Sequence, residues 1–353
     1  MVYLTLLLCF IASLAITPLV KKLAMKIGAT DKPNQRKVHS KIMPRLGGLA
    51  IFISFLIGLA FLRPQDEQLG AIVIGAFIII IIGVMDDMIE LSAKVKFLGQ
   101  IAAALIVVLN GVQVDYINLP FGGGLELGIL SIPLTILWIV GVTNAINLID
   151  GLDGLAAGVS TIALVTISAM AFVKGDIFVL SIAIILIGST LGFLKYNFHP
   201  AKIFMGDTGA LFLGFMIAVL SLLGFKNVTM LSLIVPVIIL GVPISDTFFA
   251  IIRRIVNKKP LSAPDKSHLH HCMLRLGYSH RQTVLIIYAM AASFGLAAFI
   301  FSMSTVWGAM LIVAILVLAI EVFAEKVGLV GKEYRPILRL ISERNASNHS
   351  SDK

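Results

Sequence analysis

The sequence predicts an all-α, polytopic integral membrane protein. Of its 353 residues, 58% are hydrophobic and only 13% are charged, whereas ordinary soluble domains carry about 25% charged residues. The mean hydropathy of +1.00 agrees with this. Because so few charges cannot cover a water-exposed surface, lipid must surround most of the chain. The apolar runs are continuous rather than alternating, which favours helices over the strands of a membrane barrel.

Apolar runs of the required length recur along the chain. A helix that crosses the hydrocarbon needs about 17–25 apolar residues. Eleven runs are expected to be spans: 1–20, 46–62, 69–85, 97–114, 131–149, 155–173, 177–194, 209–225, 230–252, 283–302 and 306–323. No cationic stretch precedes the first run and lysines follow it, which is the reverse of a cleaved signal peptide. It is therefore expected to be a retained span.

The basic residues predict the orientation. With the N-terminus outside, all but three of the 28 Lys and Arg residues fall in the inner segments 21–45, 86–96, 150–154, 195–208, 253–282 and 324–353. Cytoplasmic loops carry this excess, so the C-terminus is expected in the cytoplasm. The net charge of +9 is then an orientation signal, and no nucleic-acid partner is expected. Residues 1–323 are expected to form one transmembrane domain, and 324–353 a tail whose end, 345–353, is disordered.

Cysteine and histidine spacing carries little information. Cys9 lies in an apolar run and Cys272 in a polar loop, so no disulfide is predicted. The chain has no His/Cys array at the spacing of zinc ligands, so no structural zinc site is predicted.

The first polar pattern is Asp86-Asp87, at the inner end of the third run. Two adjacent carboxylates are unfavourable at a helix C-terminus, which already carries partial negative charge. The compensating charge is expected from Lys94, Lys96 or a bound divalent cation. The alternative is a solvated loop after a span.

The second pattern repeats a polar residue every third position, in Asn144, Asn147, Asp150 and Asp153. Any helical part of this stretch would place them along one face. Polar groups in register at a membrane boundary are costly unless they meet a polar ligand or water. The alternative is a pair of turns with aspartate caps.

The third and fourth patterns lie in later inner loops. Asp207, in Met205–Gly209, could cap the following helix or supply an oxygen ligand to Mg²⁺, with its flanking glycines letting phosphate approach. The histidines of the largest loop are either donors near phosphates or solvated groups without a role: His268, His270 and His271.

Two further features remain open. Asp246 lies seven and eight residues before Arg253 and Arg254, so a structural ion pair is as plausible as a ligand role. The basic first loop could contact anionic lipid or grip a phosphate. Its candidate residues are Lys32, Asn34, Lys37 and Arg45.

Together, the patterns place carboxylates, amides, imidazoles and cations on one membrane face. Oxygen ligands favour Mg²⁺ over zinc, and the mixture suits a phosphorylated substrate. A transporter or lipid flippase, the main alternative, would place polar residues at the bilayer midplane, whereas these spans are nearly free of charge. The Asp-Gly-x-x-Ala-Arg signature of the CDP-alcohol phosphotransferases is absent.

These stretches resemble the polyprenyl-phosphate N-acetylhexosamine-1-phosphate transferase family. The matching stretches, in family order, are Asp31–Asn34, Pro44–Gly48, Asp86-Asp87, Asn144–Leu155, Met205–Gly209 and His268–His271. The His-Leu-His-His order resembles the branch that uses UDP-N-acetylglucosamine. That branch includes enzymes that initiate wall teichoic acid, O-antigen and enterobacterial common antigen.

The resemblance implies a reaction at the cytoplasmic face of the bacterial plasma membrane. Undecaprenyl phosphate would attack the β-phosphorus of the UDP-sugar and release UMP, with Mg²⁺ or Mn²⁺ as cofactor. The metal would be held by Asp207 and Asn147. Asp86 and Asp87 would lie nearby as base or, as we favour, only in positioning, and Lys96 would neutralise pyrophosphate charge. The phosphates would be contacted by His268, His270, His271 and Arg275. Substrate would be bound by Lys32, Asn34, Lys37, Arg45, Asn144, Asp150 and Asp153. A homodimer is one alternative for the oligomeric state.

Overall fold

The chain folds into a bundle of long helices. The computed structural model describes residues 1–31, 42–118, 123–225, 234–260, 265, 267–329, 331 and 334–339. Within these, eight helices are long and apolar enough to cross a membrane: α1 Val2–Ile27, α3 Leu69–Ile89, α5 Ser131–Ile149, α6 Leu155–Lys174, α7 Ile177–Asn197, α8 Gly206–Phe225, α12 His280–Ser302 and α13 Val306–Val327. The all-α, polytopic membrane class is confirmed.

The remaining predicted spans are shorter or broken helices. Runs 46–62 and 97–114 correspond to α2 Gly47–Leu62 and α4 Ala93–Leu109. The predicted span over 230–252 is interrupted, because α9 Ile234–Ile239 and α10 Gly241–Val256 are separate helices. Pro236 and Pro243, which have no amide hydrogen, lie on either side of the break. The total of eleven spans and their orientation stay predictions.

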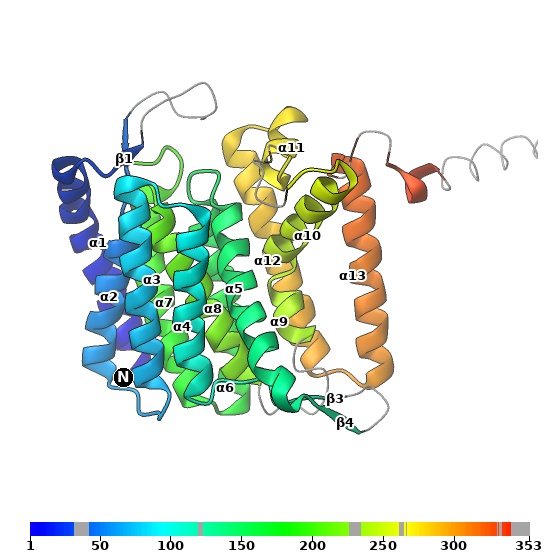
Figure 1. Cartoon of the computed structure of the whole chain (residues 1–353), viewed down its shortest axis with the longest axis horizontal. Coiled ribbons are helices and arrows are strands. Elements are labelled where there is room, and N and C mark those ends of the chain that lie inside the picture. The colour runs from blue at the N-terminus through cyan, green and yellow to red at the C-terminus, as the bar shows by residue number, and fades with distance from the viewer. Residues whose placement is uncertain are drawn as a thin grey trace, which may run out of the picture.

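Helix α8 lies at the centre of the bundle and α13 at its edge (Figure 1), with 89% of the membrane-length window of α8 buried against 6% for α13. Two glycines let neighbouring helices approach the first turn of α8. A side chain on Gly48 of α2 would collide with the backbone of Gly209, and one on Gly83 of α3 would collide with Thr208. These contacts bring the inner ends of three helices together.

The two ends of the bundle carry different loops. Strands β1 Thr30–Asp31 and β2 Met43–Pro44 pair antiparallel at the same end as α11 Leu269–Arg275 (Figure 1). The antiparallel pair β3 Tyr116–Asn118 and β4 Gly124–Glu126 lies at the opposite end, near the short 3-10 helix Gly128–Leu130. The loops that contain 21–45 and 253–282 therefore share one end, as the predicted sidedness requires.

Candidate active site

Three carboxylates and a lysine meet where α3, α4 and α8 begin or end. Asp86 and Asp87 lie in the last turn of α3 and Asp207 in the first turn of α8. Lys96 Nζ lies 2.9 Å from Asp207 Oδ2 and 3.3 Å from Asp86 Oδ2. The predicted compensating cation is therefore Lys96. Both α3 carboxylates are buried, so Asp86 and Asp87 do not form a solvated loop.

Arg45 adds a second cation from the segment between β2 and α2. Its Nε lies 3.2 Å from Asp87 Oδ1, and one terminal nitrogen lies 3.5 Å from Asp207 Oδ1. Burial opposes the charged form of Arg45, but Asp87 and Asp207 outweigh burial and raise its pKa. The guanidinium is thus held beside two carboxylates.

Backbone hydrogen bonds join the segment around Arg45 to the one before Asp207. Gly47 N donates to Phe204 O at 3.0 Å, and Phe204 N donates to Pro44 O at 2.9 Å. Two stretches more than 150 residues apart in the printed sequence therefore form one unit. That unit fixes the distance between the Arg45 cation and the Asp207 carboxylate.

Asp87 caps helix α8 from a neighbouring helix. Its oxygens accept from Asp207 N at 3.0 Å, Thr208 N at 3.1 Å and Thr208 Oγ1 at 2.7 Å. A carboxylate is stabilised there by the unpaired N–H groups and partial positive charge of the helix N-terminus. Gly206 adopts φ 71° and faces Asp87, whose carboxylate occupies the space that a Cβ would need. Asp87 is thus a positioning residue, and it supplies the cap that Asp207 was considered for.

The donor set around Asp207 fits Mg²⁺. Asp86 Oδ2 and Asp207 Oδ2 both contact Lys96 Nζ, at 3.3 Å and 2.9 Å, and two carboxylates gathered at one point require a nearby cation or a shared proton. Carboxylate and amide oxygens are ligands that Mg²⁺ prefers. Asn147, the other predicted ligand, is half-buried near the end of α5, and its role at the metal stays a prediction.

The predicted row of polar residues divides between different partners. Asn144 Nδ2 donates to Gln100 Oε1 at 2.6 Å, and Gln100 Nε2 donates back to Asn144 Oδ1 at 3.4 Å. This amide pair links α4 to α5, with Gln100 only 2% exposed. Sequence reasoning missed Gln100 because it stands alone in an apolar run.

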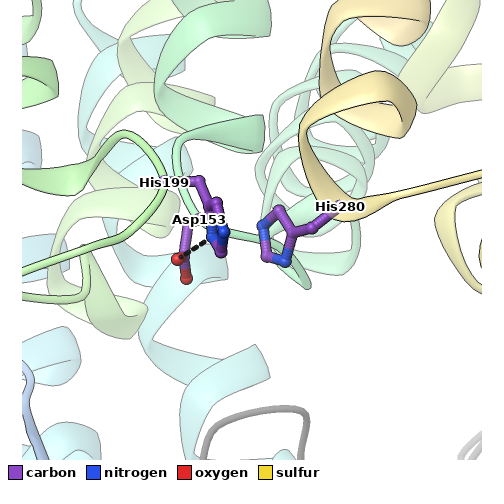
Figure 2. Close-up of side chains that lie close together, drawn as sticks. All are labelled: Asp153, His199 and His280. Carbon is purple, nitrogen blue, oxygen red and sulfur yellow. Dashed lines mark hydrogen bonds and ion pairs between the residues drawn. The ribbon is translucent and has the colours of Figure 1, made fainter.

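The two aspartates that follow α5 lie in different surroundings. Burial, and next Asp207, raise the pKa of Asp150 to about 7, with Arg45 opposing them. The charges of Asp207 and Arg45 therefore act on Asp150. Asp153 instead faces His199, whose Nδ1 lies 2.9 Å from Asp153 Oδ2 (Figure 2). Asp153 is thus held by partners outside the carboxylate–cation cluster.

The first histidine of the largest inner loop is held by Asp246. His268 Nδ1 lies 3.0 Å from Asp246 Oδ2, and Leu269 N donates to Asp246 Oδ1 at 2.8 Å. Arg253 instead pairs with Asp265, at 2.6 Å, and donates to Leu329 O at 2.6 Å. Of the alternatives left open for Asp246, the ion pair with Arg253 is therefore not the contact formed, and the ligand role stays a prediction.

The second histidine packs on the loop between α5 and α6. His270 lies in the space that a Cβ on Gly151 would need, which joins the histidine stretch to the one that carries Asp150. Burial lowers the pKa of His270 to about 3, so its imidazole is neutral at physiological pH. Burial, then His268, lowers the pKa of His271. Neutral imidazoles can donate to phosphate through N–H but carry no charge.

Some predicted residues are not brought to the cluster. Arg275 is exposed at the end of α11 and donates to Cys272 Sγ at 2.9 Å. Cys9 and Cys272 are both free. Three predicted substrate-binding residues lie outside the described residues: Lys32, Asn34 and Lys37.

Comparisons with known proteins agree with this arrangement. The model of the family described as "Glycosyl transferase family 4" matches residues 69–225, which include Asp86, Asp87, Lys96 and Asp207. The "probable undecaprenyl-phosphate N-acetylglucosaminyl 1-phosphate transferase" of Bacillus subtilis is 55% identical over 329 residues, 92% of each chain.

Two more distant relatives carry similar names. The decaprenyl-phosphate N-acetylglucosaminephosphotransferase of Mycobacterium tuberculosis is 37% identical over 80% of this chain and 78% of its own. The undecaprenyl-phosphate alpha-N-acetylglucosaminyl 1-phosphate transferase of Salmonella typhimurium is 29% identical over 78% and 77%. The chain therefore belongs to glycosyl transferase family 4, in the branch of the polyprenyl-phosphate N-acetylglucosamine-1-phosphate transferases.

Proposed function

We propose that this protein transfers N-acetylglucosamine 1-phosphate from UDP-N-acetylglucosamine to undecaprenyl phosphate, in a Mg²⁺-dependent reaction at the cytoplasmic face of the bacterial plasma membrane. The carboxylate–cation cluster of Asp86, Asp87, Asp207, Lys96 and Arg45 carries the proposal. It lies where α3 ends and α8 begins, so a lipid phosphate and a water-soluble nucleotide can both reach it. The first step of a cell-envelope glycopolymer is the expected role.

The reaction exchanges one phosphoanhydride for another. An oxygen of the lipid phosphate forms a bond to the β-phosphorus of the nucleotide sugar. The bond from that phosphorus to the bridging oxygen breaks, and UMP leaves with the electron pair. A phosphate monoester has a second pKa near 6, so the attacking oxygen is mostly deprotonated at neutral pH. No side chain is needed as a general base.

The side chains therefore act by charge and alignment. Asp207, Asn147 and Asp86 would hold Mg²⁺, which when bound neutralises pyrophosphate charge. Lys96 lies between two carboxylates and would contribute positive charge toward the phosphates. Asp87 fixes the first turn of α8 and so orients Asp207. Asp150 and the neutral His270 would line the side toward the sugar nucleotide.

The decisive experiment uses purified protein with Mg²⁺, undecaprenyl phosphate and a panel of UDP-sugars, read by mass spectrometry. The expected products are UMP and undecaprenyl-diphosphate-N-acetylglucosamine. Asp207→Asn is expected to give neither product, and Asp66→Asn, at an exposed carboxylate before α3, to give both. The proposal fails if no UDP-N-acetylhexosamine yields product, or if chelation of Mg²⁺ leaves the rate unchanged.

A further inference from the structure

A second group of side chains that could ligate a metal lies apart from the contacts of the carboxylate–cation cluster. Asp153 is in the loop between α5 and α6, His199 follows α7, and His280 begins α12 (Figure 2). One donor atom from each lies within 4.8 Å of the others. The three come from distant stretches of the chain, which is why no ligand spacing is visible in the sequence.

We propose that Asp153, His199 and His280 bind one divalent transition-metal ion, Zn²⁺ in the first instance. Imidazole nitrogen suits zinc, copper, iron and nickel, whereas Mg²⁺ takes oxygen. Two imidazoles and one carboxylate are a known zinc ligand set, usually completed by water. This site would therefore discriminate against the ion expected at Asp207.

The donors are close to the geometry of a tetrahedral ion. With ligand bonds of about 2.1 Å, neighbouring donors in a tetrahedral zinc site lie about 3.4 Å apart. His199 Nδ1 and Asp153 Oδ2 are already 2.9 Å apart. The rings of His199 and His280 are stacked, with centroids 4.3 Å apart and planes at 23°. Because all three donor atoms already lie within 4.8 Å of one another, small side-chain adjustments would bring them to that spacing.

Two details of the hydrogen bonding favour an ion here. The Nε2 atom of His280 is buried and has no hydrogen-bond partner among the described residues, an arrangement that is costly for a polar atom. Asp153 Oδ2 also accepts from Ala201 N at 3.0 Å, and such outer hydrogen bonds orient metal ligands. If Nδ1 of His199 is the ligand atom, the ion replaces its proton, which passes to solvent.

The ion would act as a clamp between structural units. The side chain of His199 is 41% exposed, so water can occupy the remaining coordination position. Asp153 is three residues from Asp150 in the loop between α5 and α6. His280 opens α12, directly after the helix α11 that carries His270 and His271. The clamp would thus hold the histidine helix and the Asp150 loop at a constant separation, without taking part in the chemistry.

The test measures Zn²⁺ itself and does not depend on the transferase activity. Full-length protein with a histidine-free affinity tag is placed in nanodiscs, stripped with chelator and dialysed against Zn²⁺, and bound metal is counted by mass spectrometry. One Zn²⁺ per chain is expected, with a rise in the unfolding midpoint. Loss of an outer-shell partner already weakens metal sites about 10–100-fold, so His199→Asn and His280→Asn should weaken binding at least about 10-fold. His271→Asn is the matched control and should bind normally.

A spectroscopic readout covers the case in which a histidine variant does not fold. Co²⁺ added to the unaltered protein should give visible d–d bands without the charge-transfer band of a thiolate ligand, and Zn²⁺ should abolish them. Excess Mg²⁺ should not. The proposal is overturned if the unaltered protein binds no stoichiometric Zn²⁺ or Co²⁺. It is also overturned if folded His199→Asn and His280→Asn bind Zn²⁺ as tightly as the unaltered chain.

Discussion

The carboxylate of Asp246 contacts both the ring of His268 and the backbone of the next residue. His268 Nδ1 lies 3.0 Å from one oxygen, and Leu269 N donates to the other at 2.8 Å. Both side chains are buried, in α10 and at the start of α11. A carboxylate in this position fixes the ring orientation and leaves the Nε2 edge of His268 for another partner. The interrupted helix α9–α10 thus positions the histidine stretch.

Asp246→Asn should therefore slow the reaction without weakening nucleotide binding. An amide oxygen can keep one of the two hydrogen bonds but not both, and small misplacement of a binding group can lower rates about 100-fold. We expect kcat to fall by about that factor with little change in KM for UDP-N-acetylglucosamine, and Asp246→Glu to recover part of it. Asp66→Asn is the control. An unchanged kcat in Asp246→Asn would show that this contact does not position His268.

Lys96→Gln should lower activity and make the protein depend more strongly on Mg²⁺. Without the ammonium, Asp86 loses its cation and Asp207 keeps only Arg45, and loss of one electrostatic contact to a transition state typically lowers rates about 10²–10³-fold. We expect a lower unfolding midpoint in chelator and a larger rise on adding Mg²⁺ than in the unaltered protein. Lys94→Gln, at an exposed position on the same helix, should alter neither quantity. An equal Mg²⁺ response in Lys96→Gln and the unaltered protein would contradict the role given to Asp86 and Asp207.

Gly206→Ala should abolish turnover, whereas Gly28→Ala should not. Both glycines adopt positive φ, 71° and 79°, so each alanine carries backbone strain of about 1–2 kcal/mol. Only Gly206 has a neighbour in the way, the Asp87 carboxylate, while nothing lies within 4 Å of a Cβ on Gly28. The comparison of UMP release between the two variants separates strain from displacement of Asp87. Equal losses of activity would indicate that strain alone is responsible.

The amide pair of Asn144 and Gln100 should prove structural. Removing one partner leaves the other as a buried amide without its hydrogen bond, which costs about 1–3 kcal/mol of stability. Asn144→Ala and Gln100→Ala should therefore each lower the unfolding midpoint. The double variant Asn144→Leu/Gln100→Leu should be more stable than either single variant, because it leaves neither amide of the pair buried without its partner. Its KM for UDP-N-acetylglucosamine should stay near normal. A large rise in KM would instead indicate that Asn144 binds the nucleotide sugar.

Asp150→Asn should raise stability at alkaline pH while lowering activity. The folded-state pKa of about 7 is above the ordinary value of 3.8, so ionising Asp150 opposes folding. Its contribution to stability is full below the unfolded pKa and is lost as pH rises from about 4 through 7. The midpoint of the variant should therefore exceed that of the unaltered chain by more at pH 8 than at pH 5, measured without Mg²⁺. Asp66→Asn should show no such trend, and a gain that is largest at pH 5 would reverse the sign we assign.

The sequence was sufficient for the membrane class, the approximate positions of the helices and the gathering of Asp86, Asp87, Lys96 and Asp207. The lengths of apolar runs and the positions of charged residues can be read from short stretches of sequence. A membrane then allows these runs to be helices, with the charged residues gathered at the helix ends. The same reasoning could not predict that Asn144, Asp150 and Asp153 would have different partners. Spacing along a chain indicates which residues can share a helix face. It does not indicate that the isolated Gln100 would pair with Asn144.

Tertiary packing decided the remaining assignments. Asp87 was favoured as a positioning residue near the metal, and only the structure shows what it holds: its oxygens accept hydrogen bonds from the first turn of α8. Asp246 was considered a partner of Arg253, yet it holds His268. In each case the partner is a backbone amide or a ring brought in from a distant part of the chain. The sequence determined which buried polar groups need hydrogen-bond partners. Because a hydrogen bond forms only over about 3 Å, the packing of the helices determined which partner each group has.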